Sequence, residues 1–290
     1  MIRSVLIIGA GELGLSLIQA FASHPSEPAV AVLLRPSSKA DISSYPVRIV
    51  HGEILAPQPE LARLLGGYDI VVSATGFAGG PGSQLHLANA ALEAKVPHYF
   101  PWQFGVDYDT IGKGSSQPLF DEQLDVRALL RSQNATKWTI VSTGLFTSFL
   151  FDPSFGVVDL KNRVVSALGS WENSLTVTSA EAIGLLTSRI ALDEEHPPEG
   201  VIFIASDTIK FEDVAHEVET KGWTVEKRVI TIEELEDRLR RDPEDLGAKY
   251  GLIWARNVGV SWALEDTWNA KKGIKTERLS QWVDRNLPRP

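Results

Sequence analysis

Three glycines near the start of the chain, Gly9, Gly11 and Gly14, have the G-x-G-x-x-G spacing that suits binding of a pyrophosphate. They follow a short apolar run typical of a buried strand and precede apolar residues at helical spacing. We expect Gly9 to form a tight turn, Gly11 to let the backbone approach the phosphates, and Gly14 to let the helix pack close to the strand. The start of the helix, at Glu12 and Leu13, would offer N–H groups to the phosphates. A plain glycine-rich turn is the alternative interpretation.

The next predicted strand, residues 29–34, ends at Arg35, at a point where folds that bind NAD usually carry an acidic residue for the ribose hydroxyls. An arginine instead suits a 2′-phosphate, which it can meet with a forked, charge-assisted contact. Lys39 follows in the same loop and would complete a basic pocket. The sequence therefore predicts NADPH or NADP as the cofactor, rather than NADH. The alternative is a solvated basic loop.

Alternating strands and helices position these residues over the first half of the chain. The expected elements are strands at 47–50, 69–73 and 138–142 and helices at 83–95 and about 118–132. Such alternation predicts an α/β fold, a Rossmann-type doubly wound parallel sheet, as an NADP-binding domain over residues 1–150. Because ligands bind beyond the carboxyl ends of the strands, Thr75, Gly76 and Phe77 should border the cofactor.

Beyond residue 150 the regular alternation lapses, and we expect a smaller C-terminal α/β substrate domain over residues 151–290. Some of its elements should pack back on the Rossmann sheet. The expected elements are strands at 164–168, 201–204 and 223–225, a helix around 211–221, and helices that start at capping-box sequences at 178–181 and 231–234. Five of the eight tryptophans lie in this region from Trp223 onward, and one or two of them could wall an aromatic pocket.

Composition excludes several classes of function. The chain of 290 residues has a net charge of −9 and no basic stripe, so we expect neither a nucleic acid nor an anionic membrane as partner. It has no cysteine, which excludes disulfides, thiolate catalysis and cysteine-based metal sites. The six histidines are scattered, so no metal site is expected. We expect a cytoplasmic protein, either a monomer or a homodimer, that acts on a small aromatic molecule.

Several segments together resemble a known family. They are the turn at Gly9, Arg35, the Phe-Pro-Trp-Gln-Phe-Gly segment at 100–105, the helix at 120–127 and the stretch at 139–146. Their combination is similar to the isoflavone reductase-like, NmrA-like branch of the atypical short-chain dehydrogenases/reductases, especially its fungal members. The resemblance covers nearly the whole chain and implies NADPH-dependent reduction of phenolic or related aromatic metabolites. It also implies that further residues contact the cofactor, namely Gln103, Phe104, Thr143 and Phe146.

The chain departs from the family pattern at two places. Trp102 and Gln103 replace a serine and a glutamate of the family's strand-end motif, and Gln123 stands where a Phe-x-x-Lys-x-x-Val-Arg helix carries the catalytic lysine. The positions of Phe120, Gln123 and Arg127 share one helix face, which supports this alignment. Gln123 can donate and accept hydrogen bonds at the nicotinamide, but it cannot act as an acid or base near neutral pH. The alternative is an exposed helical glutamine.

Other groups could replace the lysine as proton donor. The candidates are Tyr108, Lys113, Asp107 and His98, which lie on or beside an expected loop at 106–117 that follows the fifth strand, at 97–100. Tyr108 and Lys113 come nearest to a reductase pair. The spacing typical of short-chain dehydrogenases is Tyr-x-x-x-Lys on a helix, however, and Lys113 lies one residue beyond it. A solvated loop is the alternative here.

The sequence as a whole predicts an NADPH-dependent oxidoreductase that acts on an aromatic, phenolic or related secondary metabolite. Two alternatives remain open. One is an NmrA-like regulatory protein that senses NADP(H) without turning it over, and the other is a redox-neutral catalyst, such as an isomerase or cyclase, on the same fold.

Overall fold

The computed structural model of the protein describes residues 4–77 and 79–290. The chain forms two compact units, and their segments alternate along the sequence. The first unit comprises Met1–Phe104, Glu122–Val141 and Ala180–Ile202. The second comprises Gly105–Asp121, Ser142–Ser179 and Phe203–Pro290.

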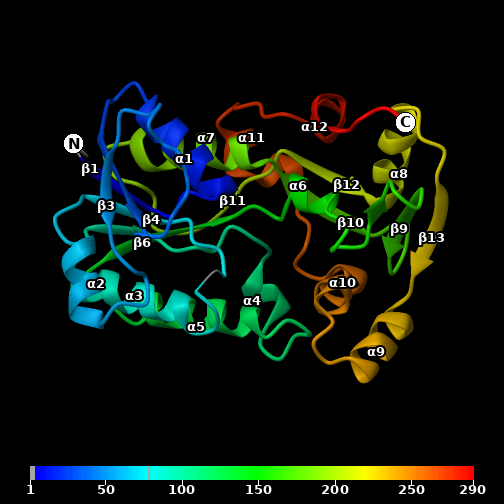
Figure 1. The fold of residues 1–290 in the computed structure, drawn as a ribbon, viewed down its shortest axis with the longest axis horizontal. Helices are drawn as coiled ribbons and strands as arrows, with labels where there is room; N and C mark the ends of the chain where they lie inside the picture. The colour runs from blue at the N-terminus through cyan, green and yellow to red at the C-terminus, as the bar shows by residue number, and fades with distance from the viewer. Residues whose placement is uncertain (1–3, 78) are drawn as a thin grey trace. The chain divides into compact units, whose positions relative to one another are not determined.

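The first unit is built around a parallel sheet. Among the described residues its elements are β1 (Ser4–Ile8), α1 (Glu12–Ala22), β2 (Ala29–Leu34), β3 (Arg48–His51), α2 (Gln58–Leu65), β4 (Ile70–Ser73), α3 (Ser83–Glu93), β5 (His98–Phe100), α5 (Leu119–Arg131), β6 (Lys137–Ser142), α7 (Ala180–Leu192) and β11 (Gly200–Phe203). The described strands form a seven-stranded sheet in the order β11-β6-β5-β4-β1-β2-β3 (Figure 1). The pairs from β3 to β6 are parallel. The predicted Rossmann-type α/β fold is therefore confirmed.

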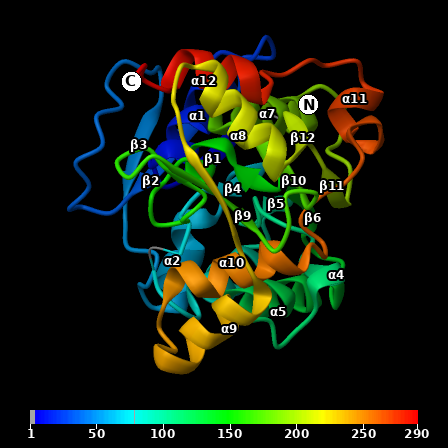
Figure 2. The ribbon, with the colours of Figure 1, turned by 90° about the vertical axis from the view of Figure 1, so that its right-hand side faces the viewer.

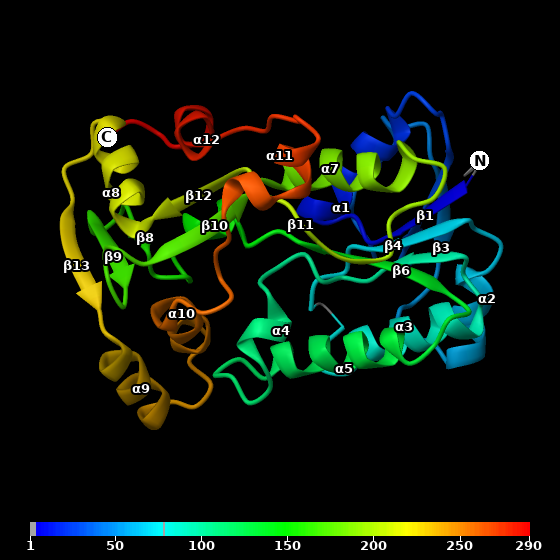
Figure 3. The ribbon, with the colours of Figure 1, turned by 180° about the vertical axis from the view of Figure 1, so that it is seen from behind.

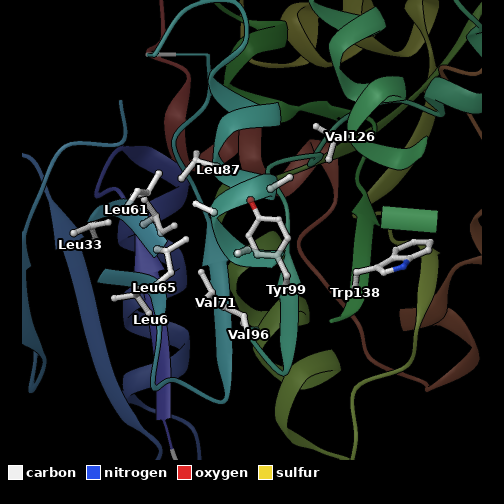
Figure 4. Packing of buried hydrophobic residues seen from close by; sticks show 14 of the residues in the cluster. Leu6, Leu33, Leu61, Leu65, Val71, Leu87, Val96, Tyr99, Val126 and Trp138 are labelled. Atoms are coloured by element: carbon white, nitrogen blue, oxygen red, sulfur yellow. The ribbon is translucent and has the colours of Figure 1, made fainter. Parts of the chain in front are cut away.

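Helices cover both faces of this sheet, which explains why its central strands are continuous apolar runs. Helices α2, α3 and α5 lie on one face, and α1 and α7 lie side by side on the other (Figure 3). Gly184 of α7 faces the backbone of α1, where an added Cβ would lie 2.5 Å from the Ser16 carbonyl oxygen. On the first face, Leu61 and Leu65 of α2 pack with Leu87 of α3 over the strands (Figure 4).

The second unit contains two small sheets. Its described elements are α4 (Tyr108–Ile111), β7 (Leu145–Phe146), α6 (Thr147–Leu150), β8 (Val158–Asp159), β9 (Val164–Leu168), β10 (Ser174–Thr178), β12 (Asp207–Lys210), α8 (Phe211–Thr220), β13 (Glu226–Ile230), α9 (Ile232–Arg241), α10 (Leu246–Arg256), a 3-10 turn (Leu264–Asp266), α11 (Trp268–Lys271) and α12 (Leu279–Asn286). In the described part of this unit the strand orders are β12-β10-β7 and β13-β9-β8. Helices α9 and α10 pack against each other (Figure 2).

Most of the expected elements are present within two residues of their predicted bounds, and one is not. The prediction of a strand at 223–225 is wrong, because the strand in this region is β13 at Glu226–Ile230. The expected loop between residues 106 and 117 contains the short helix α4. In the part of the chain that the structure describes, no helix has the length and apolar character needed to cross a membrane.

Candidate functional site

The glycine turn lies at the carboxyl end of β1, in the middle of the sheet. Gly9 has a φ of +96°, and its N–H donates to the Leu33 carbonyl oxygen at 3.0 Å. A Cβ added at Gly14 would lie 2.4 Å from the Gly9 carbonyl oxygen, so the first turn of α1 sits directly on the strand end. At Gly11 nothing lies within 4 Å of the corresponding position. The turn is therefore closed at Gly9 and Gly14 and leaves room for a ligand at Gly11.

Helix α1 begins without a side-chain cap. Gly11 occupies the N-cap position, and among the described residues no side chain accepts a hydrogen bond from the first-turn N–H groups. Glu12 is exposed and Leu13 is buried. An uncapped helix start combines free N–H donors with the positive end of the helix dipole, and this combination suits an anionic group such as a pyrophosphate.

Two cations follow the neighbouring strand β2. The Ser38 N–H donates to the Arg35 carbonyl oxygen at 2.9 Å, and the Ala40 N–H donates to Ser38 Oγ at 3.3 Å, so these residues form a turn. The side chains of Arg35 and Lys39 are exposed, and neither has an ion pair or hydrogen bond within residues 4–77 and 79–290. Both cations are therefore available to an anionic ligand at the carboxyl edge of the sheet.

The segment after β4 is fixed by contacts that the sequence did not reveal. Gln84 of α3 donates through Nε2 to Thr75 Oγ1 at 3.1 Å and to the Gly76 carbonyl oxygen at 2.5 Å. The Phe77 ring packs edge-on against Trp102, which follows β5, with ring centroids 4.6 Å apart. Thr75, Gly76 and Phe77 thus lie at the same edge of the sheet as the glycine turn.

A buried polar cluster follows β5. Arg127 donates through Nε to Gln103 Oε1 at 2.7 Å, and Gln103 donates through Nε2 to the Gln123 carbonyl oxygen at 2.8 Å. All three side chains have no exposed surface, and the adjacent Phe104 is also buried. Gln123 is therefore not an exposed helical residue, and that alternative interpretation is wrong. Its side-chain Oε1 and Nε2 have no hydrogen-bond partner in the described structure.

Glu122, beside Gln123 on α5, joins two helices of the first unit. Its carboxylate accepts hydrogen bonds from the backbone N–H groups of Gly82 and Gln84 at 2.8 Å and of Leu85 at 3.1 Å. Helix α3 has no side-chain cap of its own at Gly82. Glu122 therefore caps α3 from another helix and holds α5 at the carboxyl edge of β4.

Four other candidate residues belong to the second unit. Thr143 donates its N–H to the Gly105 carbonyl oxygen at 2.9 Å, and Phe146 ends the short strand β7. Tyr108 begins α4 and is buried, with its ring edge-on to Phe120. Helix α4 ends at Ile111, so Tyr108 and Lys113 do not share one helix. The roles suggested for these four residues remain predictions.

His98 lies elsewhere, and its proposed placement beside the loop after the fifth strand is wrong. It is the first residue of β5, at the amino edge of the sheet, where it lines a hollow of about 570 Å³ with Asp69, Lys137, His196 and Glu199. Its Nε2 is 2.7 Å from Thr139 Oγ1, and burial lowers its pKa to about 4. His98 is thus uncharged at neutral pH and lies at the edge opposite the glycine turn.

Within the described ranges no group of His, Asp and Glu side chains could hold a metal ion.

The residues present at the carboxyl edge fit a phosphorylated dinucleotide. Across the sheet, the exposed cations follow β2, the uncapped helix follows β1, Thr75 to Phe77 follow β4, and the polar cluster follows β5. The first three positions match the order of the 2′-phosphate, the pyrophosphate and the segment that leads to the nicotinamide in an extended NADP molecule. An orphaned buried amide at the last position further indicates that a ligand completes this edge.

Comparison with known proteins places the chain in a family. The sequence profile described as the NmrA-like family matches residues 1–250. A protein from Gibberella moniliformis (strain M3125 / FGSC 7600), described as an NmrA-like family domain-containing oxidoreductase, is 40% identical over 303 residues and 99% of both chains.

Two solved structures share the fold. Leucoanthocyanidin reductase from Vitis vinifera, in its binary complex with NADPH, superposes with a TM-score of 0.80 at 17% identity, over 97% of this chain and 98% of that chain. AtPrR2 with NADP+ and (+)pinoresinol has a TM-score of 0.78 at 16% identity, over 98% of both chains. From the profile and the 40% identical relative, we conclude that the chain belongs to the NmrA-like family.

Proposed function

We propose that this protein is an NADPH-dependent oxidoreductase that reduces an aromatic, phenolic or related secondary metabolite. Two neighbouring features at the carboxyl edge carry the proposal. Helix α1 begins without a cap above an open Gly11, and the side chain of Arg35 beside it has no partner among the described residues. The oxidoreductase name of the 40% identical relative supports it, as do the NADPH and NADP+ in the two similar structures.

In this proposal each end of the cofactor is held by different residues. The N–H groups at the start of α1 bind the pyrophosphate, and Arg35 and Lys39 bind the 2′-phosphate. Thr75, Gly76 and Phe77 border the middle of the cofactor. NADPH supplies a hydride, while the protein orients it and the substrate. The polar cluster of Gln103, Gln123 and Arg127 is the part of the first unit closest to the expected nicotinamide end.

The cofactor assignment is tested by titrating the protein with NADPH and with NADH, using tryptophan fluorescence. We expect Arg35→Ala to weaken NADPH binding by about 10- to 100-fold, because a charge-assisted contact contributes about 1.5–3 kcal/mol. NADH binding should not change. Arg63→Ala is the matched control, since Arg63 is an exposed arginine of α2 in the same unit. Equal losses for both dinucleotides, or none, would contradict the assignment.

A second candidate function is a sensor that binds NADP(H) without turning it over. The observation in its favour is Gln123, a residue without an acidic proton at the position of the family's lysine. A redox-neutral reaction on the same fold is favoured by the same residue. The test is the absorbance at 340 nm, which falls as NADPH is oxidised. Reduction of an aromatic carbonyl compound at a rate on the order of one turnover per second would exclude both alternatives.

A further inference from the structure

The Gln123 side chain is a buried carboxamide with no hydrogen-bond partner in the part of the chain that the structure describes. It has no exposed surface, and both Oε1 and Nε2 lack a partner. No other carboxamide in the described part of the chain leaves both its donor and its acceptor without a partner. Buried polar groups in proteins are nearly always paired, and an exception calls for an explanation such as a missing ligand. The unpaired amide therefore indicates a bound group that carries both an acceptor and a donor.

The position of Gln123 indicates which ligand this is. The strands that carry the proposed cofactor contacts run in the order β2, β1, β4, and β5 comes next. Gln123 is tied to the end of β5 through its own carbonyl oxygen and Gln103. It is also next to Glu122, which fixes α5 at the end of β4. Gln123 thus lies one strand beyond the cofactor contacts, where the acceptor of the hydride would sit.

A carboxamide recognises a different group from the lysine that it replaces. Lysine offers donors only and can supply a proton, whereas a glutamine offers one N–H edge and one carbonyl edge side by side and supplies no proton. Its complement is a carbonyl oxygen with a hydroxyl beside it. Such a substrate brings its own acidic proton to the oxygen that is reduced.

We propose that Gln123 selects aromatic ketones that carry a hydroxyl group ortho to the carbonyl, and that this hydroxyl replaces the proton donor of the family. The inference rests on the proposed function. Gln123 Nε2 donates to the carbonyl oxygen, and Oε1 accepts from the hydroxyl. The carbonyl carbon gains the hydride as NADPH becomes NADP+, and the carbonyl electron pair moves to its oxygen. As negative charge builds on that oxygen, the hydroxyl redirects its proton from Gln123 Oε1 to it, and the resulting phenolate then takes a proton from water and leaves hydroxide.

Three ketones test the proposal: ortho-hydroxybenzophenone, its ortho-methoxy ether and para-hydroxybenzophenone. Binding is measured first, by fluorescence titration of the protein saturated with NADP+. We expect the ortho-hydroxy ketone to bind the wild type at least about tenfold more tightly than the other two, as one additional satisfied hydrogen-bond pair predicts. In Gln123→Leu this ratio should fall to about one, while the affinity for NADPH stays unchanged.

Turnover is the second measurement. Wild type should reduce the ortho-methoxy ether about 100-fold more slowly than the ortho-hydroxy ketone, because loss of a general acid costs about 10²–10⁴-fold. Gln123→Lys should narrow this difference, since the lysine supplies the missing proton. Gln123→Leu should remain folded and unfold at the same or a higher urea concentration, because it replaces an unpaired amide with an apolar group of similar size.

The outcomes separate this inference from the proposed function. Equal binding and equal turnover of the hydroxy and methoxy ketones would overturn the inference and leave the reductase intact. A weaker affinity of Gln123→Leu for NADPH would also overturn it, because the cofactor would then be the partner of the amide. Absence of NADPH binding to the wild type would overturn both.

Discussion

At the scale of single residues, Gly11 and Gly14 lie three positions apart but are needed for different reasons. Substitution of each glycine by alanine distinguishes the two reasons. Gly14→Ala places a methyl group 2.4 Å from the Gly9 carbonyl oxygen, so the backbone must shift. We expect a loss of about 2 kcal/mol in the free energy of unfolding, typical of overpacking. Gly11→Ala meets nothing within 4 Å and should cost less than about 1 kcal/mol. It should nevertheless weaken NADPH binding at least about tenfold, because the methyl group fills the space that we propose for the phosphates.

Urea unfolding and NADPH titration of the two variants check this prediction. Each variant serves as the control for the other, because the chemical change is the same. Normal NADPH affinity in Gly11→Ala would show that the open space at this turn does not receive the pyrophosphate.

Residue patterns revealed the glycine turn because its constraints are local: three glycines within six positions and an apolar run before them. They did not reveal the cluster of Gln103 and Arg127, whose partners are 24 positions apart and meet only in the folded chain. The burial of Gln123 was equally hidden. Helical spacing places a side chain on a face, but the spacing does not say what covers that face.

At the scale of elements, Glu122 of α5 caps the start of the neighbouring helix α3. We therefore expect substitution of Glu122 to lower the free energy of unfolding. Glu122→Ala removes the acceptor of three backbone N–H groups at an otherwise uncapped, positive helix end. We expect a loss of about 1–2 kcal/mol in the free energy of unfolding. Glu122→Gln should lose less, because an amide oxygen still accepts.

The matched control for this prediction lies at the other end of α3. Glu93 is exposed in the last turn, where a carboxylate faces the negative end of the dipole. Glu93→Ala should therefore change stability by less than about 0.5 kcal/mol. Equal effects of Glu122→Ala and Glu93→Ala in urea unfolding would refute the capping role.

The bounds of the strands were predicted most accurately where the strand is a run of mostly apolar residues. The bounds of β2 and β9 agree with the expected 29–34 and 164–168, because their apolar runs are buried by neighbouring layers. The prediction failed at β13, whose residues Glu226, Lys227 and Arg228 are exposed and charged. Its stability comes from parallel pairing with β9, a contact across 62 positions from Val164 to Glu226. No local hydropathy pattern contains that information.

At the scale of the whole molecule, His98 links the stability of the folded chain to pH. Burial lowers its pKa from 6.5 to about 4, so between these pH values the unfolded chain binds a proton that the folded chain does not. The stabilisation is complete above pH 6.5 and is lost as the pH falls towards 4. At pH 5 the loss amounts to about 2 kcal/mol, since each pKa unit corresponds to about 1.4 kcal/mol.

The 37 acidic residues and the net charge of −9 also make unfolding depend on pH, so the effect of His98 must be measured as a difference between two chains. His98→Gln provides that difference, because its amide can still donate to Thr139 Oγ1 but does not titrate in this range. Between pH 7 and pH 5 the wild type should lose about 2 kcal/mol more of its unfolding free energy than the variant. Urea unfolding at the two pH values measures both losses. Parallel pH dependences would mean that the imidazole becomes protonated in the folded chain as readily as in the unfolded one.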